Sequence, residues 1–310
     1  MNTDIWIDYE SYLKVFQVWM DDAGYTSATQ KAYIHTVQDF LKQASDKQVE
    51  KMNKLDIMTY LTRARRKGVS DQTRNRKLFA IRSFFKSLKD MEMVEVNPAM
   101  DVKLSKTERN QLPVFLEEND LSVFLKQIEG RYSSRNIAIF LLMAYAGLRV
   151  GEVHRLNIAD FHQERGSLHV MGKGRKWRAV PLPGALAQIL GQVLGERRDP
   201  NRSIETSFFI SQKGYRLSIR QIQTIAQQTF TKLQEQEGQE GLQDLKLSCH
   251  KLRHSFATMM LRQGTDIRIV KELMGHESIE TTMIYTHVSD SQREEAMQAI
   301  QLPDLQLTSG

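Results

Sequence analysis

The chain has 310 residues, 41% of them hydrophobic, and carries a formal net charge of +6 with an isoelectric point of about 9.2. This length is enough for two domains with ordinary cores, and the basic balance favours a polyanionic partner. The sequence has no apolar run of about 18 residues that would predict a membrane span. The single cysteine, Cys249, excludes an internal disulfide, so we expect a cytoplasmic protein without a membrane partner.

Residues 8–90 predict four amphipathic helices that close a small bundle. Apolar side chains recur at helical spacing, as at Val15, Phe16 and Trp19. Small polar residues and glycines separate the periodic stretches, which is typical of helix ends. The expected boundaries are a cap at Thr26 or Ser27, a third helix over Leu55–Arg65, and a fourth helix that starts after Ser70 or Asp71.

Positive charge concentrates on the third and fourth of these helices. Residues 63–89 contain ten Lys or Arg and one acidic residue, Asp71. Such a face lies either along a DNA groove, with its side chains on phosphates and bases, or in solvent as an ordinary charged surface. The helix pattern by itself favours neither. The candidate DNA-binding residues are Arg74, Arg76, Lys77, Arg82 and Lys86.

A polar segment follows the bundle. The pair Asn97-Pro98 ends the helical region, because the residue before a proline resists helix, and Leu112-Pro113 opens the next periodic stretch. We expect a helical domain over residues 1–103, the candidate DNA-binding domain, followed by a linker over 104–111 and a second domain over 112–310. A flexible linker would let the two domains close around a duplex.

The second domain is predicted to be mostly helical with a small sheet in its middle. Ser167–Met171 and Arg178–Pro181 predict two strands joined by a glycine-rich basic turn. The very apolar stretch 136–146 predicts a buried helix that ends at Gly147. The remaining expectations are helices over 118–129, from Glu152 onward, over 183–195 and over 218–236, with a loop over 237–247.

The last part of the chain places four polar side chains in a helical pattern. His250 and Arg253 are three residues apart, so they share one face of a helix. Gly275 stops a helix just before His276, and Tyr285 follows in a short helical pattern. Two histidines, an arginine and a tyrosine are able to hold a phosphodiester and to attack it with a phenol oxygen.

Together with two upstream residues, this stretch resembles the tyrosine recombinase family, which includes phage-type integrases and Xer-type recombinases. Arg149 lies in Ala-Gly-Leu-Arg-Val-Gly-Glu, and Lys173 lies in Gly-Lys-Gly-Arg-Lys. The family pattern is Arg, Lys, His-x-x-Arg, His or Trp, then Tyr. It is met in order by Arg149, Lys173, His250, Arg253, His276 and Tyr285. The resemblance implies a mostly α fold of two domains: an N-terminal SAM-like, core-binding helical bundle and a C-terminal α-rich catalytic domain with a small antiparallel sheet.

The resemblance also implies a chemistry for these residues. Attack on a phosphodiester adds charge to its non-bridging oxygens, and Arg149 and Arg253 would stabilise that charge with paired donors and without a metal. Tyr285 would be the nucleophile, and its phenol, with an ordinary pKa of about 10, needs a base or a cationic site. His250 is the candidate base, and Lys173 would protonate the leaving 5′ oxygen.

Further roles and partners follow from the same resemblance. His276 would donate a hydrogen bond to the scissile phosphate, and Glu152 would orient neighbouring backbone or arginine groups. Tyr285 would form a 3′-phosphotyrosyl ester, which conserves the energy of the cleaved phosphodiester bond. Neither ATP nor another cofactor is then needed. The expected partner is double-stranded DNA with inverted-repeat half-sites. Four copies of the chain would pass through a Holliday junction on paired sites, with accessory DNA-binding proteins as further partners.

Two other classes of function stay open from the sequence. A type IB topoisomerase uses the same residue types as a monomer, and a DNA-binding protein with a decayed site would bind without cleavage. A zinc protease is excluded, because His250 is not followed by the glutamate of His-Glu-x-x-His. The ending Leu-Pro-Asp-Leu-Gln-Leu-Thr-Ser-Gly lacks the His-Pro-Arg-like tail of host Xer proteins, so we expect a gene carried by a plasmid, phage or transposon.

Residues 289–300 predict a short amphipathic helix beyond the tyrosine. Ser289 or Asp290 would cap it, and Met297 and Ile300 fall on one side. So short a helix needs a surface that buries these two side chains. That surface belongs either to the same domain or to a neighbouring protomer, and the resemblance favours the neighbour.

Overall fold

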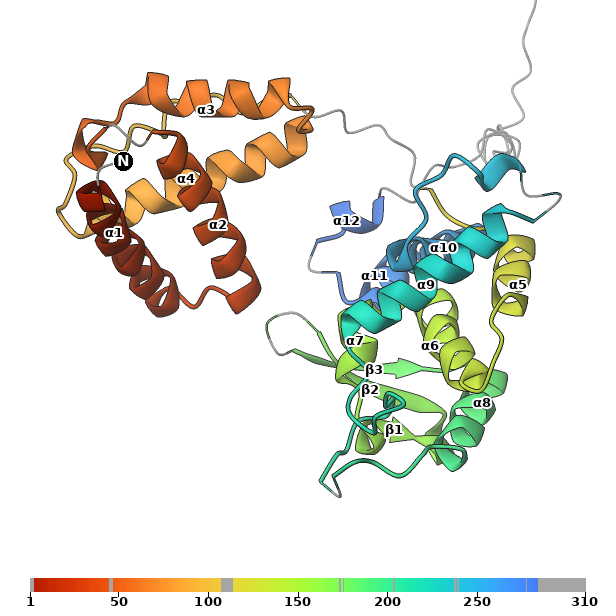
Figure 1. Cartoon of the computed structure of the whole chain (residues 1–310). Helices are drawn as coiled ribbons and strands as arrows, with labels where there is room; N and C mark the ends of the chain where they lie inside the picture. The colour runs from red at the N-terminus through yellow and green to blue at the C-terminus, as the bar shows by residue number, and fades with distance from the viewer. Residues whose placement is uncertain are drawn as a thin grey trace, which may run out of the picture. The chain divides into compact units, whose positions relative to one another are not determined.

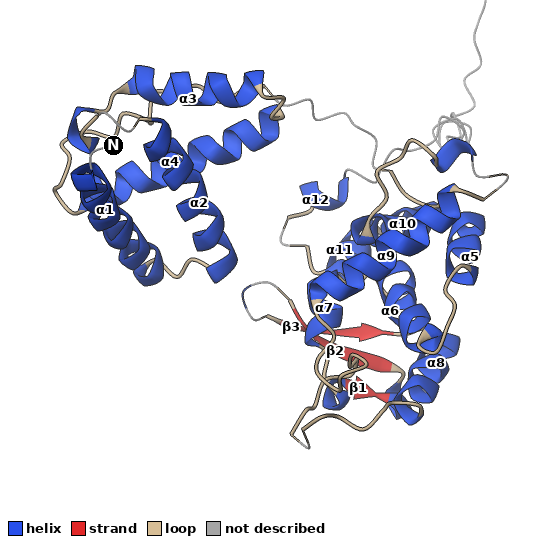
Figure 2. Ribbon diagram, viewed as in Figure 1, coloured by secondary structure: helices blue, strands red, loops and turns tan. Residues whose placement is uncertain are grey.

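The computed structural model describes residues 3–44, 47–106, 114–172, 174, 176–202, 204–236, 238, 240–276 and 278–283. The chain divides into two compact units, 1–111 and 112–310, and each has its own hydrophobic core. Figures 1 and 2 show the helices and strands of each unit. No described helix is long and apolar enough to cross a membrane. Lys173, Tyr285 and the tail over 289–310 lie outside the described residues, so the expectations for them stay predictions.

The first unit is a bundle of four helices in which α4 packs against each of the other three. The side chains of Thr26 and Ser70 accept hydrogen bonds from the backbone N–H groups three residues further on, which confirms the predicted starts of two helices. The helices are α1 (Thr3–Asp22), α2 (Ser27–Gln43), α3 (Lys54–Arg66) and α4 (Asp71–Asp90).

Aromatic side chains hold this bundle together. Phe84 of α4 meets Phe16 of α1 edge-on with ring centroids 5.6 Å apart, and Phe85 meets Phe40 of α2 in the same way at 6.3 Å. All four rings are essentially inaccessible to solvent. Because α4 commits its apolar side to this core, its positive side chains are left on the outer faces of the helix.

The segment after α4 runs back along that helix. Arg82 donates from Nε to the Ala99 carbonyl at 3.1 Å and from Nη2 to the Met100 and Val102 carbonyls at 3.0 and 2.7 Å. Nearer the start of α4, Asn75 exchanges two hydrogen bonds with the backbone of Ser105, at 2.9 and 2.8 Å. Residues 99–105 are therefore fastened to the first unit, including the first part of the stretch expected to be a linker.

The second unit is built around the apolar helix α6, which packs against α5, α7, α8 and α10. Contacts on several sides explain why its sequence is hydrophobic around most of its circumference. The helices are α5 (Glu118–Lys126), α6 (Ser133–Tyr145), α7 (Val150–Arg155), α8 (Gly184–Gly195), α9 (Ile219–Gln234), α10 (Cys249–Arg262), α11 (Ile267–Met274) and α12 (Glu280–Met283).

The sheet is antiparallel with the strand order β1-β2-β3. β2 (Ser167–Met171) has the bounds predicted from the sequence, and β3 (Trp177–Pro181) begins one residue earlier than predicted. In the β2–β3 pairing, Met171 lies opposite Trp177 and Ser167 lies opposite Pro181. The strand β1 (Phe161–His162) was not predicted, because a two-residue strand has no measurable alternation.

Two close approaches bring α6, α10 and α11 together. Val270 and Met274 of α11 pack on Phe256 and Ala257 of α10 in a small buried cluster. Gly147, which ends the α6 segment, has φ +64°, and a Cβ added there would lie 2.7 Å or less from two atoms of the Phe256 ring. Only glycine allows the turn before α7 to lie this close to α10.

The attachment of residues 99–105 leads to a stability prediction. Replacing Arg82 with Ala removes three charged hydrogen bonds to backbone carbonyls, and we expect the unfolding free energy of the first unit to fall by about 2 kcal/mol. Urea denaturation followed by circular dichroism measures the change. Arg76→Ala is the matched control, because Arg76 lies exposed on the same helix. Equal effects of the two substitutions would contradict the attachment.

Candidate active site

One buried carboxylate lies at the centre of the candidate site. Glu152 is 2% exposed and occupies the third position of α7. Its Oε2 accepts from the Arg149 backbone N–H at 2.8 Å, and its Oε1 accepts from Arg149 Nη1 at 3.0 Å. Arg149 is thus both the N-cap residue of α7 and a partner of the carboxylate. The helix begins just after Arg149, two residues before the predicted start.

Two further arginines surround the same carboxylate. Arg178 of β3 donates from Nη1 to Oε1 and from Nη2 to Oε2 of Glu152, both at 3.0 Å. Arg253 of α10 places Nη1 3.7 Å from Oε2. Burial tends to raise the pKa of Glu152, but Arg178, followed by the Arg149 backbone and Arg253, holds that pKa below its ordinary value. Three guanidiniums around one carboxylate leave a surplus of positive charge.

The same three arginines bind the C-terminal end of α11. Arg178 Nε donates to the Leu273 carbonyl at 2.9 Å. Arg253 Nη2 and Arg149 Nη1 donate to the Met274 carbonyl at 2.6 and 3.1 Å, and Arg149 Nη2 donates to the Gly275 carbonyl at 3.1 Å. These are carbonyls without a helical partner, where the helix dipole is negative and cations are favoured.

Gly275 is required at the turn that follows α11. Its φ of +61° lies in the left-handed region, and a Cβ added there would lie 2.8 Å from Nη1 of Arg178. The predicted helix stop at Gly275 is confirmed, since it is the C-cap residue of α11. The turn sends the next residue, His276, toward the guanidiniums.

Both histidines of the predicted set lie in this electropositive environment. Partial desolvation, followed by the charges of Arg253 and Arg149, lowers the pKa of His250 from its ordinary value. Desolvation, then Arg253 and Arg149, lowers the pKa of His276 to about 4. Both imidazoles are therefore neutral at pH 7. A neutral imidazole can accept a proton from an attacking hydroxyl or donate its N–H to an anion.

His276 is held in place through α12. Its Nδ1 lies 2.9 Å from Oγ1 of Thr282, a residue that is fully buried on that short helix. Fixing the ring at Nδ1 leaves Nε2 as the atom that is able to meet a ligand. α12, which contacts His276 through Thr282, ends at Met283. In the sequence, Tyr285 comes two residues after Met283.

The structure thus brings together four of the six residues predicted from the sequence: Arg149, His250, Arg253 and His276. Sequence reasoning missed the part played by Arg178. A signal was available, because Arg178 and the buried Val180 are two residues apart on β3 and lie on the same face. A positive charge on the inner face of a strand predicts a buried carboxylate partner.

The positive side chains of α4 in the first unit mostly have partners within the chain. Lys77 lies 3.3 Å from Asp39 and 2.8 Å from the Tyr60 hydroxyl, and Lys86 lies 2.6 Å from Asp90. Arg74 donates to the Lys103 carbonyl at 3.3 Å. Arg76 is exposed, and no hydrogen bond or ion pair to it is found among the described residues. Since most of these side chains already contact the protein itself, their binding to DNA stays a prediction.

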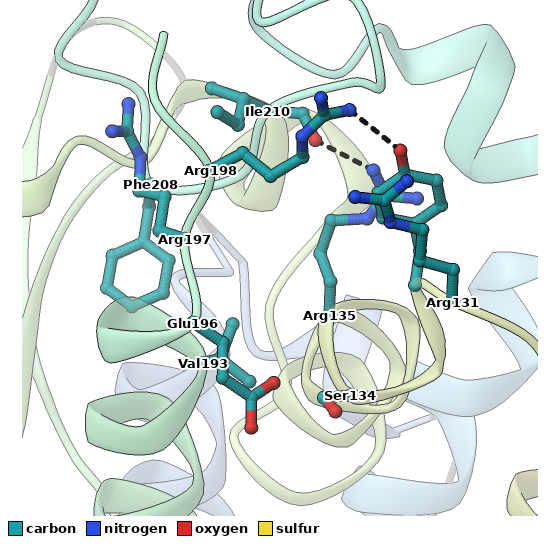
Figure 3. A pocket seen from close by; sticks show the side chains of 10 residues that line it. Arg131, Ser134, Arg135, Val193, Glu196, Arg197, Arg198, Phe208 and Ile210 are labelled. Atoms are coloured by element: carbon teal, nitrogen blue, oxygen red, sulfur yellow. Dashed lines mark hydrogen bonds between the residues drawn. The ribbon is translucent and has the colours of Figure 1, made fainter.

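A second arginine group at the start of α6 has a different character (Figure 3). Arg135 Nη1 donates to the Ile210 carbonyl at 2.7 Å, and Arg198 Nη1 donates to the Tyr132 hydroxyl at 2.9 Å. Arg198 Nη1 also donates to the Gln212 carbonyl at 2.9 Å. Arg197 likewise binds the carbonyls of Ser207 and Glu205 at 3.1 Å. These guanidiniums fasten the connection between α8 and α9. Their cavity, of about 60 Å³, contains no histidine and no buried carboxylate.

A cavity of about 560 Å³ adjoins the candidate site, between β3 and α11. Its lining includes Arg178 and His276 together with the exposed apolar side chains of Trp177 and Ile269. Among the residues that the structure describes, no group of three His, Cys, Asp or Glu side chains could hold a metal ion. The site therefore offers guanidiniums and neutral imidazoles to an anionic ligand.

Comparison with known proteins agrees with this geometry. Residues 114–292 match the phage integrase family, and residues 12–95 match the N-terminal SAM-like domain of phage integrases. The chain is 34% identical to tyrosine recombinase XerC of Thermodesulfovibrio yellowstonii, over 86% of this chain and 87% of that protein. It is 30% identical to tyrosine recombinase XerD of Oceanobacillus iheyensis, over 90% and 93% of the two chains.

Solved structures show the same fold. A structure of the XerH site-specific recombinase bound to its difH substrate matches with a TM-score of 0.70 and 26% identity, over 87% of this chain and 78% of that one. The Tn1549 transposon integrase bound to circular intermediate DNA matches with a TM-score of 0.74 at 19% identity, over 92% and 98% of the two chains. At that identity the second likeness concerns the fold alone.

The buried carboxylate generates a prediction about stability and pH. Glu152→Gln leaves three guanidiniums without a counter-charge, and we expect the unfolding free energy to fall by about 3–5 kcal/mol at pH 7. Because the folded pKa of Glu152 is lowered, its contribution is present above the unfolded pKa of about 4.3 and is lost as the pH falls through the folded value. The difference between wild type and variant should therefore shrink on acidification.

Denaturant titration at a series of pH values measures this difference. Glu129→Gln is the control, because the ion pair of Glu129 with Lys232 is exposed and its loss should leave stability nearly unchanged. A Glu152→Gln protein as stable as wild type at pH 7 would show that the carboxylate does not organise the site.

Proposed function

The chain belongs to the phage integrase family and is a tyrosine recombinase, and from this premise we propose that it cleaves and rejoins DNA at specific sites through a covalent bond to Tyr285. Tyr285 attacks a backbone phosphate, takes it as a 3′-phosphotyrosyl ester and releases a 5′-hydroxyl. A 5′-hydroxyl of the partner duplex then attacks the ester and restores a phosphodiester. Each step exchanges one phosphate ester for another, so ATP has no role.

The observation that carries the proposal is the surplus of positive charge fixed around Glu152. Arg149 uses both hydrogens of Nη1 and one of Nη2 on Glu152 and on the turn after α11. Among the described residues, its Nε–H and one hydrogen of Nη2 have no acceptor. Nε and Nη2 form one edge of the guanidinium, the edge that is able to bind two oxygens of a phosphate. The Arg149 side chain is 35% exposed, so a ligand is able to reach these donors.

The two neutral histidines complete the proposed chemistry. His250 accepts the phenol proton of Tyr285 as the base, which its lowered pKa allows at neutral pH. His276, held through Nδ1, donates from Nε2 to a non-bridging phosphate oxygen. Arg149 and Arg253 stabilise the charge that develops on those oxygens. Lys173, on the turn between β2 and β3, protonates the leaving 5′ oxygen.

DNA is the proposed partner of both units. Double-stranded DNA enters the site described above, and the outer face of α4, with Arg74, Arg76, Lys77, Arg82 and Lys86, contacts its backbone. Arg76 is the most available of these side chains, since it lies exposed. We assign paired inverted-repeat half-sites, a tetramer, a Holliday junction and accessory DNA-binding proteins to the reaction on the strength of family membership. The SAM-like and catalytic domains correspond to residues 1–103 and 112–310, with a linker over 104–111.

The tail and the origin of the gene belong to the same proposal. A helix over 289–300 docks on a neighbouring protomer and couples the tyrosines of adjacent copies. We also keep a mobile element as the proposed carrier of the gene. The likeness to the Tn1549 integrase does not add to this proposal, because at 19% identity it concerns the fold.

Two measurements separate this function from its rivals. A covalent protein–DNA adduct on a nicked duplex distinguishes an enzyme from a DNA-binding protein with an inactive site. Exchange of strands between two labelled duplexes distinguishes a recombinase from a type IB topoisomerase, which rejoins the strand it has cut. Adducts without exchange on paired half-sites would favour the topoisomerase.

The nucleophile is tested by Tyr285→Phe, which removes a single hydroxyl. We expect site-specific DNA binding to persist and the covalent adduct to disappear, because no other phenol oxygen takes its place. Gel-shift and denaturing-gel assays on the same nicked duplex report the two properties. An adduct formed in undiminished yield would assign the nucleophile to another residue.

The general acid is tested by Lys173→Ala with a substrate that carries sulfur at the 5′-bridging position. A thiolate leaves without a proton, so the sulfur substrate should restore cleavage to the variant. The oxygen substrate should be cut far more slowly, with DNA binding retained. Equal impairment on the two substrates would remove Lys173 from this role.

A further inference from the structure

We propose that Arg178 is a positioning residue of this active site: it fixes the carboxylate of Glu152 and, through it, the guanidinium of Arg149 that binds the phosphate. The inference rests on the proposed function, because it assigns a role within the same site. Arg178 lies on β3, outside the six-residue pattern by which the site was predicted.

The first observation is how Arg178 holds Glu152. A carboxylate has two oxygens, and Arg178 donates to both of them at 3.0 Å, one from each Nη. A planar guanidinium fork is the side chain that holds both oxygens at once and fixes rotation of the carboxylate. The remaining hydrogen bonds to Glu152 come from the backbone N–H and Nη1 of Arg149. The orientation that Arg178 imposes on the carboxylate therefore sets where Arg149 points.

The second observation is that Arg178 also holds the backbone turn after α11, which binds Arg149. Its Nε donates to the Leu273 carbonyl at 2.9 Å, and its guanidinium fills the space beside Gly275 that a Cβ would occupy. The next two carbonyls of that turn, of Met274 and Gly275, accept from Arg149. Arg149 is thus held by a carboxylate and by a backbone turn, and Arg178 contacts both.

Each of the two arginines uses three N–H hydrogens on the protein, so it is their exposure that separates them by role. The Arg178 side chain is 14% exposed, and three of its N–H groups are used on Glu152 and Leu273. The Arg149 side chain is 35% exposed, so a ligand is able to reach its Nε–Nη2 edge. Arg149 therefore binds the phosphate, and Arg178 supports it from the protein side.

A competing explanation is that Arg178 merely fastens the β2–β3 hairpin to the rest of the unit. The chain offers a matched control for that explanation. Arg155 donates from Nη2 to the Met171 carbonyl at the end of β2, at 3.0 Å. It ties down the other strand at the base of the same turn, and its described contacts include neither Glu152 nor the turn after α11. Arg155→Ala removes this attachment of the hairpin and leaves the hydrogen bonds that position Arg149 in place.

The experiment measures single-turnover formation of the covalent adduct on a nicked site duplex, together with affinity for that duplex. We expect Arg178→Ala to slow adduct formation about 100-fold, the scale of a misplaced catalytic group, with affinity little changed. Arg155→Ala should react at the wild-type rate. Arg178→Lys keeps the charge but cannot hold both carboxylate oxygens, so it should stay slow. Thermal melting of each variant confirms that it is folded at the assay temperature.

A double-mutant cycle tests the route through Glu152. If Arg178 acts by way of the carboxylate, Arg178→Ala combined with Glu152→Gln should react no more slowly than the slower single variant. The proposal would be overturned if the rate losses of the two single variants multiplied in the double variant. A wild-type rate for Arg178→Ala would also overturn it, and so would equal losses of rate for Arg155→Ala and Arg178→Ala. Should Arg178→Ala melt below the assay temperature, a folded Arg178→Lys that reacts at the wild-type rate overturns it instead. A wild-type protein that forms no adduct refutes the proposed function itself, which is a distinct outcome.

Discussion

The arrangement of the active site depends on one interaction, the buried contact of Glu152 with three guanidiniums. Like charges a few ångströms apart repel strongly where water is scarce, so Arg149, Arg178 and Arg253 share this space only around a carboxylate. A carboxylate 2% exposed is equally costly without cations. The carboxylate and the guanidiniums each require the other. Together they join α7, β3, α10 and the end of α11, whose contacting residues are up to 126 positions apart in the sequence.

The charge balance of this group is suited to holding the phosphodiester that we propose as its ligand. One negative charge does not neutralise three positive ones, and the excess is fixed by hydrogen bonds before any ligand arrives. Desolvation, followed by the same positive charge, lowers the pKa values of His250 and His276. A bound phosphate supplies the missing negative charge. The positive side chains are thus in place before negative charge develops on the phosphate oxygens in the transition state. Stabilising that developing charge is what accelerates the reaction.

The first unit shows that a local excess of positive charge does not translate directly into a free binding surface. Residues 63–89 are strongly basic, yet Arg82 donates its hydrogen bonds to backbone carbonyls of residues 99–102. Lys77 and Lys86 form ion pairs with acidic neighbours. Charge on this helix therefore serves two purposes. Part of it fastens the segment that leaves the bundle, and part of it, as at the exposed Arg76, faces outward where a duplex would be met.

Four features could be predicted from the sequence: the helical class, the bounds of the β2–β3 hairpin to within a residue, the helix stop at Gly275 and the membership of the family. They depend on local periodicity, glycine conformation and a short ordered motif. The contact of Arg178 with Glu152 and that of Arg82 with the segment after α4 could be found only in the folded chain. Both contacts unite residues distant along the chain, and any of the 43 Lys and Arg side chains would satisfy the same composition. Which guanidinium meets which acceptor is set by how the buried helices and strands pack. Spacing along β3 indicates that Arg178 shares a face with the buried Val180, but it does not indicate that Glu152 is the partner.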